Sequence, residues 1–157
     1  MKFMQYISLA GATTLTGWSE RTLWRKLADG SVTRSPSSSR AMLVFNDIAA
    51  YSCIPLEPED LLMIEQADGG NVAAQTETAI LFLQHGKPKS AVYWLDLATK
   101  HDDANAMYLL GRCYTDGSGI SRDENLGIMW IAKAASLKHV LAQGVMRSMR
   151  NGYLNQA

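Results

Sequence analysis

The sequence predicts a mainly α-helical protein in which a small N-terminal module with a β-hairpin precedes a short α-solenoid. Three observations lead to this fold class. Small and apolar residues recur at helical spacing through the second half of the chain, and the pattern occurs there twice. The first third instead shows two short helical patterns and then alternating apolar residues around a Ser/Pro turn. With 157 residues, 47% of them hydrophobic, the chain can bury a core.

The N-terminal module is expected to begin with two helices separated by a tight turn. A short helical pattern begins with Ile7 and ends near Leu15, and Gly17 supplies the turn. Ser19 is expected to cap the second helix, because its hydroxyl can accept a backbone N–H of the first turn. Gly30 ends that helix.

A hairpin and a short helix are expected to complete this module, which spans residues 1–56. The hairpin covers Ser31–Phe45, with its turn at residues 35–39. Leu43 and Phe45 alternate as its inward residues. Asn46 is expected to cap a short helix over Asp47–Tyr51.

This order of elements resembles the winged helix-turn-helix of the MerR and excisionase families over about a third of the chain. The resemblance is carried by Gly17, Ser19, Arg21, Thr22, Leu23, Gly30, Val32, Arg40 and the run Asn46–Asp47–Ile48. In those families the second helix enters the major groove of DNA and the wing contacts phosphates. The resemblance therefore implies DNA contacts from Arg21, Thr22, Arg25, Lys26, Arg34 and Arg40.

Charge and composition bear on DNA binding in opposite directions. Residues 1–45 carry six basic side chains, Lys2 among them, against two acidic ones, and the resulting +4 is balanced by −4 in the remainder. A polyanion would therefore meet the N-terminal module. However, Met42 and Val44 stand where the wing is usually basic or aromatic, and Trp18 replaces a small aliphatic residue. Two alternatives stay open: DNA binding, or protein docking without DNA.

Residues 57–70 are expected to form a linking helix that caps the open end of the solenoid. Pro58 suits its first turn, and the helix runs to about Asp68. Its apolar side chains, expected to pack on the first repeat, are Leu61, Leu62 and Ile64.

Residues 71–157 are expected to form the solenoid of about two and a half helix-pair repeats. The matched pairs are Ala74 with Ala106, Ala79 with Gly111, Phe82 with Tyr114, Trp94 with Trp130, and Ala98 with Ala134. The first three pairs are 32 residues apart and the last two are 36 apart, because the turn of the first repeat is shorter. A period in this range indicates stacked helix pairs.

The expected helix boundaries of the solenoid follow from capping residues. They place helices at Asn71–Gln84 and Pro88–Lys100, a restart at Asp102–Asp103, a stop at Gly117 and Gly119, a cap at Asp123, and a last helix from Val140 to Asn151 stopped by Gly152.

The second copy of this pattern resembles the Sel1-like repeats, relatives of the tetratricopeptide repeats. The residues that carry the resemblance are Leu110–Gly111, Tyr114, Gly117, Gly119, Trp130, Ala134–Ala135, His139 and Ala142. The first copy matches less closely, since it lacks the glycine loop and has Thr78 in the place of Leu110. The resemblance covers about half the chain and implies a protein-interaction scaffold. His139 is expected to be a structural residue between helices.

The sequence offers no constellation for catalysis, so the protein is expected to be non-catalytic and to use no cofactor. His85, His101 and His139 are widely spaced, and Cys53 and Cys113 form no metal-ligand motif. No apolar run approaches the length of a membrane span and no secretory signal is evident, so a cytoplasmic protein without membrane contact is expected.

Two partner surfaces are expected on the solenoid. Met107, Tyr108 and Arg112 fall off the packing face of their helix and are candidates for contact with a protein partner. The last helix carries an apolar stripe of Val145, Met146 and Met149, through which two copies of the chain would form a homodimer. The leading hypothesis is a regulator that binds DNA through its N-terminal module and protein through its repeats. The alternative is an adaptor in which both modules contact proteins.

Overall fold

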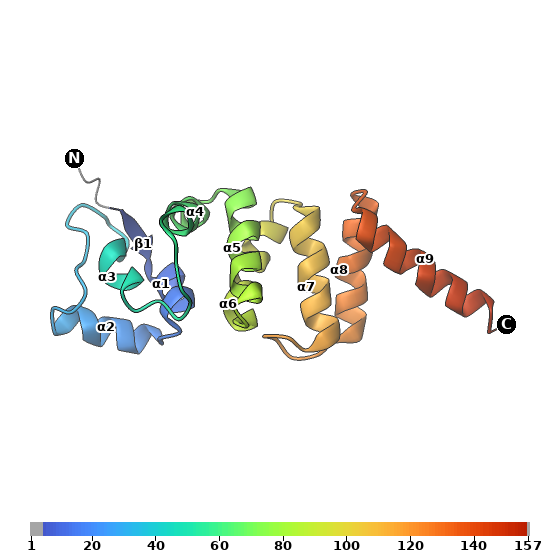
Figure 1. Ribbon diagram of the computed structural model, residues 1–157, viewed down its shortest axis with the longest axis horizontal. Helices are drawn as coiled ribbons and strands as arrows, with labels where there is room; N and C mark the ends of the chain where they lie inside the picture. The colour runs from blue at the N-terminus through green and yellow to red at the C-terminus, as the bar shows by residue number, and fades with distance from the viewer. Residues whose placement is uncertain (1–4, 157) are drawn as a thin grey trace. The chain divides into compact units, whose positions relative to one another are not determined.

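The computed structural model describes residues 5–156 and divides the chain into two compact units (Figure 1). The first unit ends at Ala74 and the second begins at Gln75. Strands β1 and β2 and helices α1 to α4 belong to the first unit, and helices α6 to α9, with most of α5, belong to the second. Residues 5–156 are therefore mainly helical, as the sequence predicts, and contain one small antiparallel sheet.

A two-stranded sheet lies in the core of the first unit. Strand β1 (Tyr6–Ser8) runs antiparallel to β2 (Met42–Val44), with Ile7 opposite Leu43. Both of these side chains are fully buried. The prediction that Ile7 begins a helix is wrong, because its backbone pairs with a strand that lies far along the sequence.

Two capped helices follow the first strand, as predicted. Helix α1 (Leu9–Thr16) begins after Ser8, and it ends at Gly17, whose φ of 72° lies in the left-handed region. Helix α2 (Glu20–Ala28) begins after Ser19, whose side chain accepts the backbone N–H of the third residue beyond it.

The segment between α2 and β2, residues 31–41, is called the wing below. Arg34 forms an isolated antiparallel bridge with Leu43, and the N–H of Ser35 donates to the carbonyl of Met42 at 2.8 Å. The expected hairpin is therefore present as a short bridged segment, and the longer pairing of β2 is with β1.

Helix α3 (Phe45–Ala49) begins two residues earlier than the sequence indicates. Val44 occupies the N-cap position and no side chain caps the helix, so the predicted cap at Asn46 is wrong. Asn46 already lies inside the helix, because the chain turns directly from the strand into it. Asp47 instead accepts the N–H of Thr33 at 2.9 Å and ties α3 to the wing.

Helix α4 (Pro58–Asp68) packs against β1 within the first unit. The carboxylate of Asp68 accepts the Ser8 N–H at 2.7 Å and the Ser8 hydroxyl at 2.5 Å. Ile64 is fully buried, but Leu62, which was expected to be an inward residue, is 51% exposed. A polar contact across 60 residues thus joins α4 to the start of the chain.

Five helices follow α4 along the chain. They are α5 (Val72–Gln84), α6 (Pro88–Thr99), α7 (Ala104–Asp116), α8 (Glu124–Ser136) and α9 (Val140–Leu154). The predicted caps at Asn71, Asp103 and Asp123 are confirmed by their side-chain hydrogen bonds. The predicted stop at Gly152 is wrong, because this glycine keeps a helical backbone and α9 continues to Leu154.

Helices α7 and α8 lie side by side in the second unit and cross at two glycines (Figure 1). A Cβ atom on Gly111 would lie 2.7 Å from Cγ1 of Ile131 and 2.8 Å from the carbonyl oxygen of Gly127. A Cβ atom on Gly127 would lie 2.8 Å from the carbonyl oxygen of Gly111. Gly111, one of the small residues that recur at helical spacing, thus permits the close approach of the two helices. Its counterpart Gly127 was not identified, although a glycine inside a helical pattern is a recognisable signal.

The turn between α7 and α8 also depends on glycine. Gly117 and Gly119 have φ values of 68° and 74°. Gly119 additionally lies against the start of α6, where an added Cβ would be 2.4 Å from the carbonyl carbon of Pro88. This turn is therefore fixed both by backbone conformation and by close packing.

Candidate protein-interaction site

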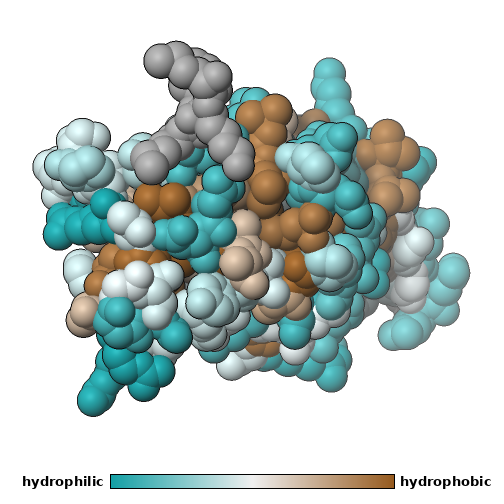
Figure 2. Space-filling model, turned by 60° about the vertical axis from the view of Figure 1, so that its left-hand side comes forward, coloured by the Kyte–Doolittle hydropathy of each residue, from teal (hydrophilic) through white to brown (hydrophobic). Residues whose placement is uncertain are grey.

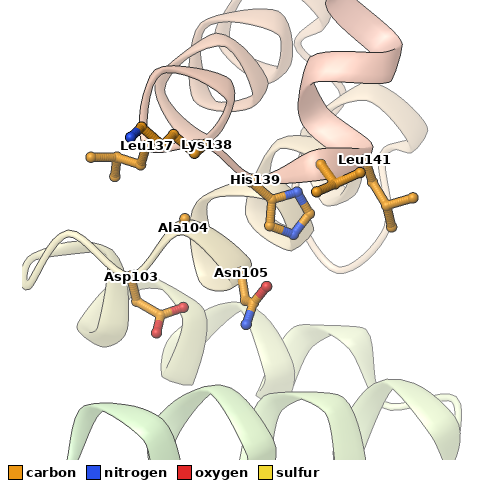
Figure 3. A pocket seen from close by; sticks show the side chains of 8 residues that line it. Asp103, Ala104, Asn105, Leu137, Lys138, His139 and Leu141 are labelled. Atoms are coloured by element: carbon orange, nitrogen blue, oxygen red, sulfur yellow. The ribbon is translucent and has the colours of Figure 1, made fainter.

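A shallow depression of about 430 Å³ lies between the start of α7 and the loop that joins α8 to α9 (Figure 3). It is lined by Asp103, Ala104, Asn105, Leu137, Lys138, His139, Val140 and Leu141. Two of these residues are helix caps: Asp103 accepts the Ala106 N–H at 2.7 Å, and Nδ1 of His139 accepts the Ala142 N–H at 3.2 Å. The depression is therefore built on two fixed helix starts.

Three apolar side chains beside this depression reach solvent. Leu137 is 45% exposed, Val140 is 73% exposed and Leu141 is 62% exposed. Figure 3 shows Leu137 and Leu141 projecting on opposite sides of His139. An apolar patch with a polar rim is typical of a protein-interaction surface. We call these three residues the α8–α9 patch.

Sequence reasoning did not identify the α8–α9 patch. The signal was present, since Leu137, Val140 and Leu141 surround His139 where one helix ends and the next begins. The first turn of a helix is rarely covered on all sides, so apolar residues there often remain accessible.

The predicted partner residue Met107 is buried. It is 1% exposed and forms a core cluster with Ile131, Ala134 and Ala142. The prediction that Met107 lies off the packing face is wrong, because α9 covers this side of α7 in addition to α8. Met107 is therefore a core residue rather than an accessible contact.

Tyr108 and Arg112, the other two predicted partner residues, lie one helical turn apart on α7. The Tyr108 ring is half-buried and stacks on His139, with 4.7 Å between ring centroids. Nη1 of Arg112 donates to the Tyr108 hydroxyl at 3.3 Å, and Nη2 lies 3.6 Å from the Asp116 carboxylate. The hydrogen bond with Tyr108 raises the pKa of Arg112 above its ordinary value. The Arg112 side chain is therefore exposed, and its contacts with Tyr108 and Asp116 hold it along α7. It lies next to the Tyr108 ring, which stacks on His139 beside the depression.

His139 has the structural role expected of it. Its imidazole both caps α9 and stacks on Tyr108 between helices. The cap occupies Nδ1, and the stacking fixes the plane of the ring.

The apolar stripe predicted for a homodimer is partly occupied within one chain. Val145 and Met146 pack against the cluster around Met107. The exposed apolar residues of α9 are instead Val140 and Leu141 at its start and Tyr153 and Leu154 at its end. Two of the three residues of the stripe are thus covered within the chain, because α9 packs on α8 as a half repeat.

The residues predicted to contact DNA differ in the exposure and the contacts of their side chains. Arg21, Arg25, Arg34 and Arg40 are exposed, and within residues 5–156 none of them forms an ion pair. Thr22 takes part in the cap of α2, where its N–H donates to the Ser19 hydroxyl at 3.2 Å. Lys2 lies outside the described residues.

Lys26 is engaged by two aromatic rings. Its Nζ lies 5.7 Å from the ring centroid of Trp18 and 5.7 Å from that of Tyr51. The centroids of these two rings lie 4.8 Å apart, so the rings also contact each other. Trp18, the unusual residue after the turn, thus contacts both the end of α3 and a cation. Lys26 is half-buried by this arrangement and is less available to a phosphate than its arginine neighbours.

Other chemistry is sparse in the described part of the chain. Residues 5–156 contain no group of three or more His, Cys, Asp or Glu side chains placed to hold a metal ion. Both cysteines are free thiols, and burial raises the pKa of Cys113. Among the same residues, no helix is long and apolar enough to cross a membrane.

Comparisons with known proteins concern the repeats. The Sel1 repeat matches residues 72–103 and 104–139. The rat (Rattus norvegicus) protein DAP3-binding cell death enhancer 1 is 29% identical over 92 residues, covering 57% of this chain and 18% of that protein. A Sel1 repeat protein from Oxalobacter formigenes has a crystal structure with a TM-score of 0.54 and 27% identity, covering 66% of this chain and 31% of that one.

The chain therefore spans less than a third of each of these two relatives. The two matched ranges coincide with the helix pairs α5–α6 and α7–α8. The glycine crossing, the glycine turn and the helix caps at Asp103, Asp123 and His139 lie within them. These two helix pairs match the Sel1 repeat in sequence.

Proposed function

We propose that this protein is a non-catalytic adaptor whose Sel1 repeats bind a partner protein. The observation that carries the proposal is the pair of Sel1 repeats at residues 72–103 and 104–139. Stacked helix pairs present extended surfaces that suit protein recognition. The name of the rat relative describes it as DAP3-binding, which supports a binding role here.

The α8–α9 patch is the contact surface we assign to this adaptor. Its three side chains expose apolar area beside a depression of about 430 Å³, next to Tyr108 and Arg112. Aromatic residues and arginine often dominate the energy of protein interfaces. A partner that covers the patch would bury Leu141 and Val140 and meet the Arg112 guanidinium at the rim.

Quantitative affinity capture tests this proposal. The full chain is compared with a Val140→Asp/Leu141→Asp variant, because a buried unpaired carboxylate opposes association. A matched control is Leu62→Asp, which places the same charge at an apolar residue of the first unit that is 51% exposed. We expect a protein that is retained by the full chain and by the control but not by the patch variant.

The captured protein is then purified and its affinity measured directly. An affinity at least tenfold weaker for the patch variant corresponds to about 1.4 kcal/mol and supports the surface assignment. Equal affinities for the full chain and the patch variant would contradict it. Retention of no protein by the full chain would argue against the adaptor itself.

DNA binding is a second candidate function, and the exposed Arg21, Arg25, Arg34 and Arg40 favour it. It is the leading hypothesis from the sequence, but it ranks below the adaptor because the family comparisons support the repeats. The test is the salt dependence of binding to mixed-sequence duplex DNA. Removing one phosphate-binding side chain reduces the steepness of log K against log salt by about one.

A double variant tests the groove-facing role of α2 in DNA binding. Arg21→Ala/Arg25→Ala is expected to reduce the steepness of the salt dependence by about two if both side chains bind phosphates. The matched control is Arg147→Ala/Arg150→Ala, which removes two exposed arginines from α9. An unchanged slope in the first variant, or equal reductions in both, would exclude α2 as the DNA-contacting helix.

A further inference from the structure

A second groove lies in the first unit, between helix α2 and the wing. It measures about 500 Å³ and is lined by Trp24, Leu27, Ala28, Gly30, Val32, Thr33 and Arg34. One wall is the outer side of α2, and the other is the backbone of the wing as it approaches its bridge with Leu43. We call it the α2–wing groove.

Trp24 is an exposed aromatic residue at the rim of this groove. It is 46% exposed, whereas the preceding Leu23 is fully buried in the core. Successive helical residues point about 100° apart, so α2 cannot bury both. Among the residues that the structure describes, the ring contacts of this unit involve Trp18 and Tyr51, and Trp24 takes part in none of them. The indole therefore offers a large apolar face that no other ring of residues 5–156 covers.

Positive charge surrounds the groove. Arg21 and Ala28 lie one helical turn from Trp24, Arg25 lies one turn before Ala28, and Arg34 lines the opposite wall. Residues 19–41 carry five basic and two acidic side chains, a net charge of +3.

The nearby carboxylates do not neutralise these arginines by direct contact. Asp29 accepts the N–H and the hydroxyl of Ser31, and these hydrogen bonds lower its pKa, with smaller contributions from the charges of Lys26 and Arg25. Asp47 accepts the Thr33 N–H. The third carboxylate, Glu20, lies in the first turn of α2. Figure 2, which brings the N-terminal side of Figure 1 forward, shows apolar patches set among hydrophilic side chains.

We propose that the α2–wing groove binds a short acidic segment of a partner protein. One large apolar side chain of the segment rests between Trp24 and Leu27, and its carboxylates meet Arg25 and Arg34. Charge complementarity selects an acidic ligand, and the apolar lining selects a peptide over duplex DNA, whose bases stack on one another inside the double helix. This site is separate from the α8–α9 patch and gives the protein a second contact surface.

The test uses the full chain and labelled peptides in fluorescence anisotropy. The probes are short peptides with glutamates on both sides of a single Leu, Phe or Trp, and matched peptides with lysine in place of each glutamate. A mixed-sequence DNA duplex is the third probe. We expect the acidic peptides to bind, the lysine peptides to fail, and the binding to weaken with added salt.

Variants connect the binding to the groove. Trp24→Ala is expected to weaken peptide binding at least about tenfold, the scale of an interface tryptophan. Tyr153→Ala removes an aromatic ring that is 80% exposed on α9 and is expected to change nothing. Arg25→Glu/Arg34→Glu is expected to abolish binding, while Arg150→Glu preserves it. Circular dichroism of each variant establishes that the helices remain.

Several outcomes would overturn the proposal. Peptide binding that survives Trp24→Ala would place the site elsewhere, and absence of peptide binding would remove it. DNA binding that depends on Arg25 and Arg34, without peptide binding, would assign the surface to nucleic acid. None of these outcomes involves Val140 or Leu141, so the failure of this groove and the failure of the adaptor surface are distinguishable.

Discussion

Each of the two compact units of this protein is stabilised internally by a different kind of interaction. In the first unit, the Asp68 carboxylate binds the backbone and side chain of Ser8 across 60 residues of sequence. Gly11 leaves room for it, since a Cβ there would lie 2.6 Å from an Asp68 oxygen. In the second unit, α7 and α8 approach closely because Gly111 and Gly127 carry no side chains. The first unit depends on a polar anchor, the contact of Asp68 with Ser8. The second depends on two glycines that allow its helices to approach closely.

In the second unit, the repeat position occupied by Gly111 carries side chains of very different size in the other repeats. By the 32- and 36-residue offsets, Gly111 corresponds to Ala79 in the first repeat and to Arg147 in α9. Ala79 is fully buried and Arg147 is exposed. The position accepts a long charged side chain only in the half repeat, where no further helix follows α9 among the described residues. The size of the side chain at this position therefore follows whether another helix covers it.

The largest expected effect comes from adding a side chain at the glycine crossing. Gly111→Val is expected to destabilise the second unit by about 3 kcal/mol, because its Cβ collides with the Gly127 backbone and overpacking of this kind is costly. Hydrogen exchange read by mass spectrometry localises the loss of protection, which should be confined to peptides from residues 75–156.

Gly144 provides the matched control for this variant. It also lies inside a helix, but nothing stands within 4 Å of an added Cβ. Gly144→Val is expected to be neutral or slightly stabilising, because valine has a better helix propensity than glycine. Equal protection losses in the two variants would show that the crossing does not depend on the absent side chain.

The sequence predicts the second unit better than the first, and the reason is physical. Helix-pair repeats are built from local contacts, so the spacing of Ala106, Gly111 and Trp130 already predicts the helices and the face they bury. Strand β1 has only three residues, and Ile7 pairs with the distant Leu43, so the local pattern at Ile7 gives no sign of a strand. The Ser8–Asp68 contact has no sequence signature, because many aspartates end helices near solvent.

The interaction surfaces were predicted less well than the fold. Exposure of Arg21 and Arg25 follows from the helical pattern of α2, and the structure agrees. The burial of Met107 depends on where α9 packs, which no local pattern determines. The pairing of Lys26 with Trp18 and Tyr51 likewise joins three segments that only the fold brings together.

Removing the polar anchor of the first unit is the second largest expected effect. Asp68→Ala leaves the N–H and hydroxyl of Ser8 without this acceptor, which is expected to cost about 2 kcal/mol. The loss of protection should appear in hydrogen exchange of residues 5–74. Ser8→Ala removes one of the two hydrogen bonds and should cost less. A larger effect in the second unit would contradict the division of roles between the units.

A smaller effect is expected in the turn of the second repeat. Gly119→Ala combines a φ of 74° with a Cβ 2.4 Å from Pro88, for an expected cost of about 1.5 kcal/mol. Gly86→Ala, in the turn of the first repeat, has a φ of 66° and open space around the added atom. It isolates the conformational cost, expected to be about 1 kcal/mol. Equal midpoints of urea unfolding for the two variants would show that the contact with Pro88 contributes nothing.

The smallest expected effect is a dependence of the first unit on pH. Burial raises the pKa of Asp68, and this outweighs the hydrogen bonds from Ser8, which act to lower it. With a folded pKa above the unfolded one, the native state binds more protons between the two values. The free energy of unfolding therefore falls as pH rises through that window, by at most about 1.4 kcal/mol per pH unit for one proton. Asp68→Asn removes the titrating group but keeps an acceptor for Ser8, so its stability should lack this slope. The measurement is the pH profile of stability, from hydrogen exchange of residues 5–74, for the wild type and this variant. Parallel profiles above about pH 4 would show that the carboxylate is ionised in the fold as readily as in water. The anchor would then be an exposed contact rather than a buried one.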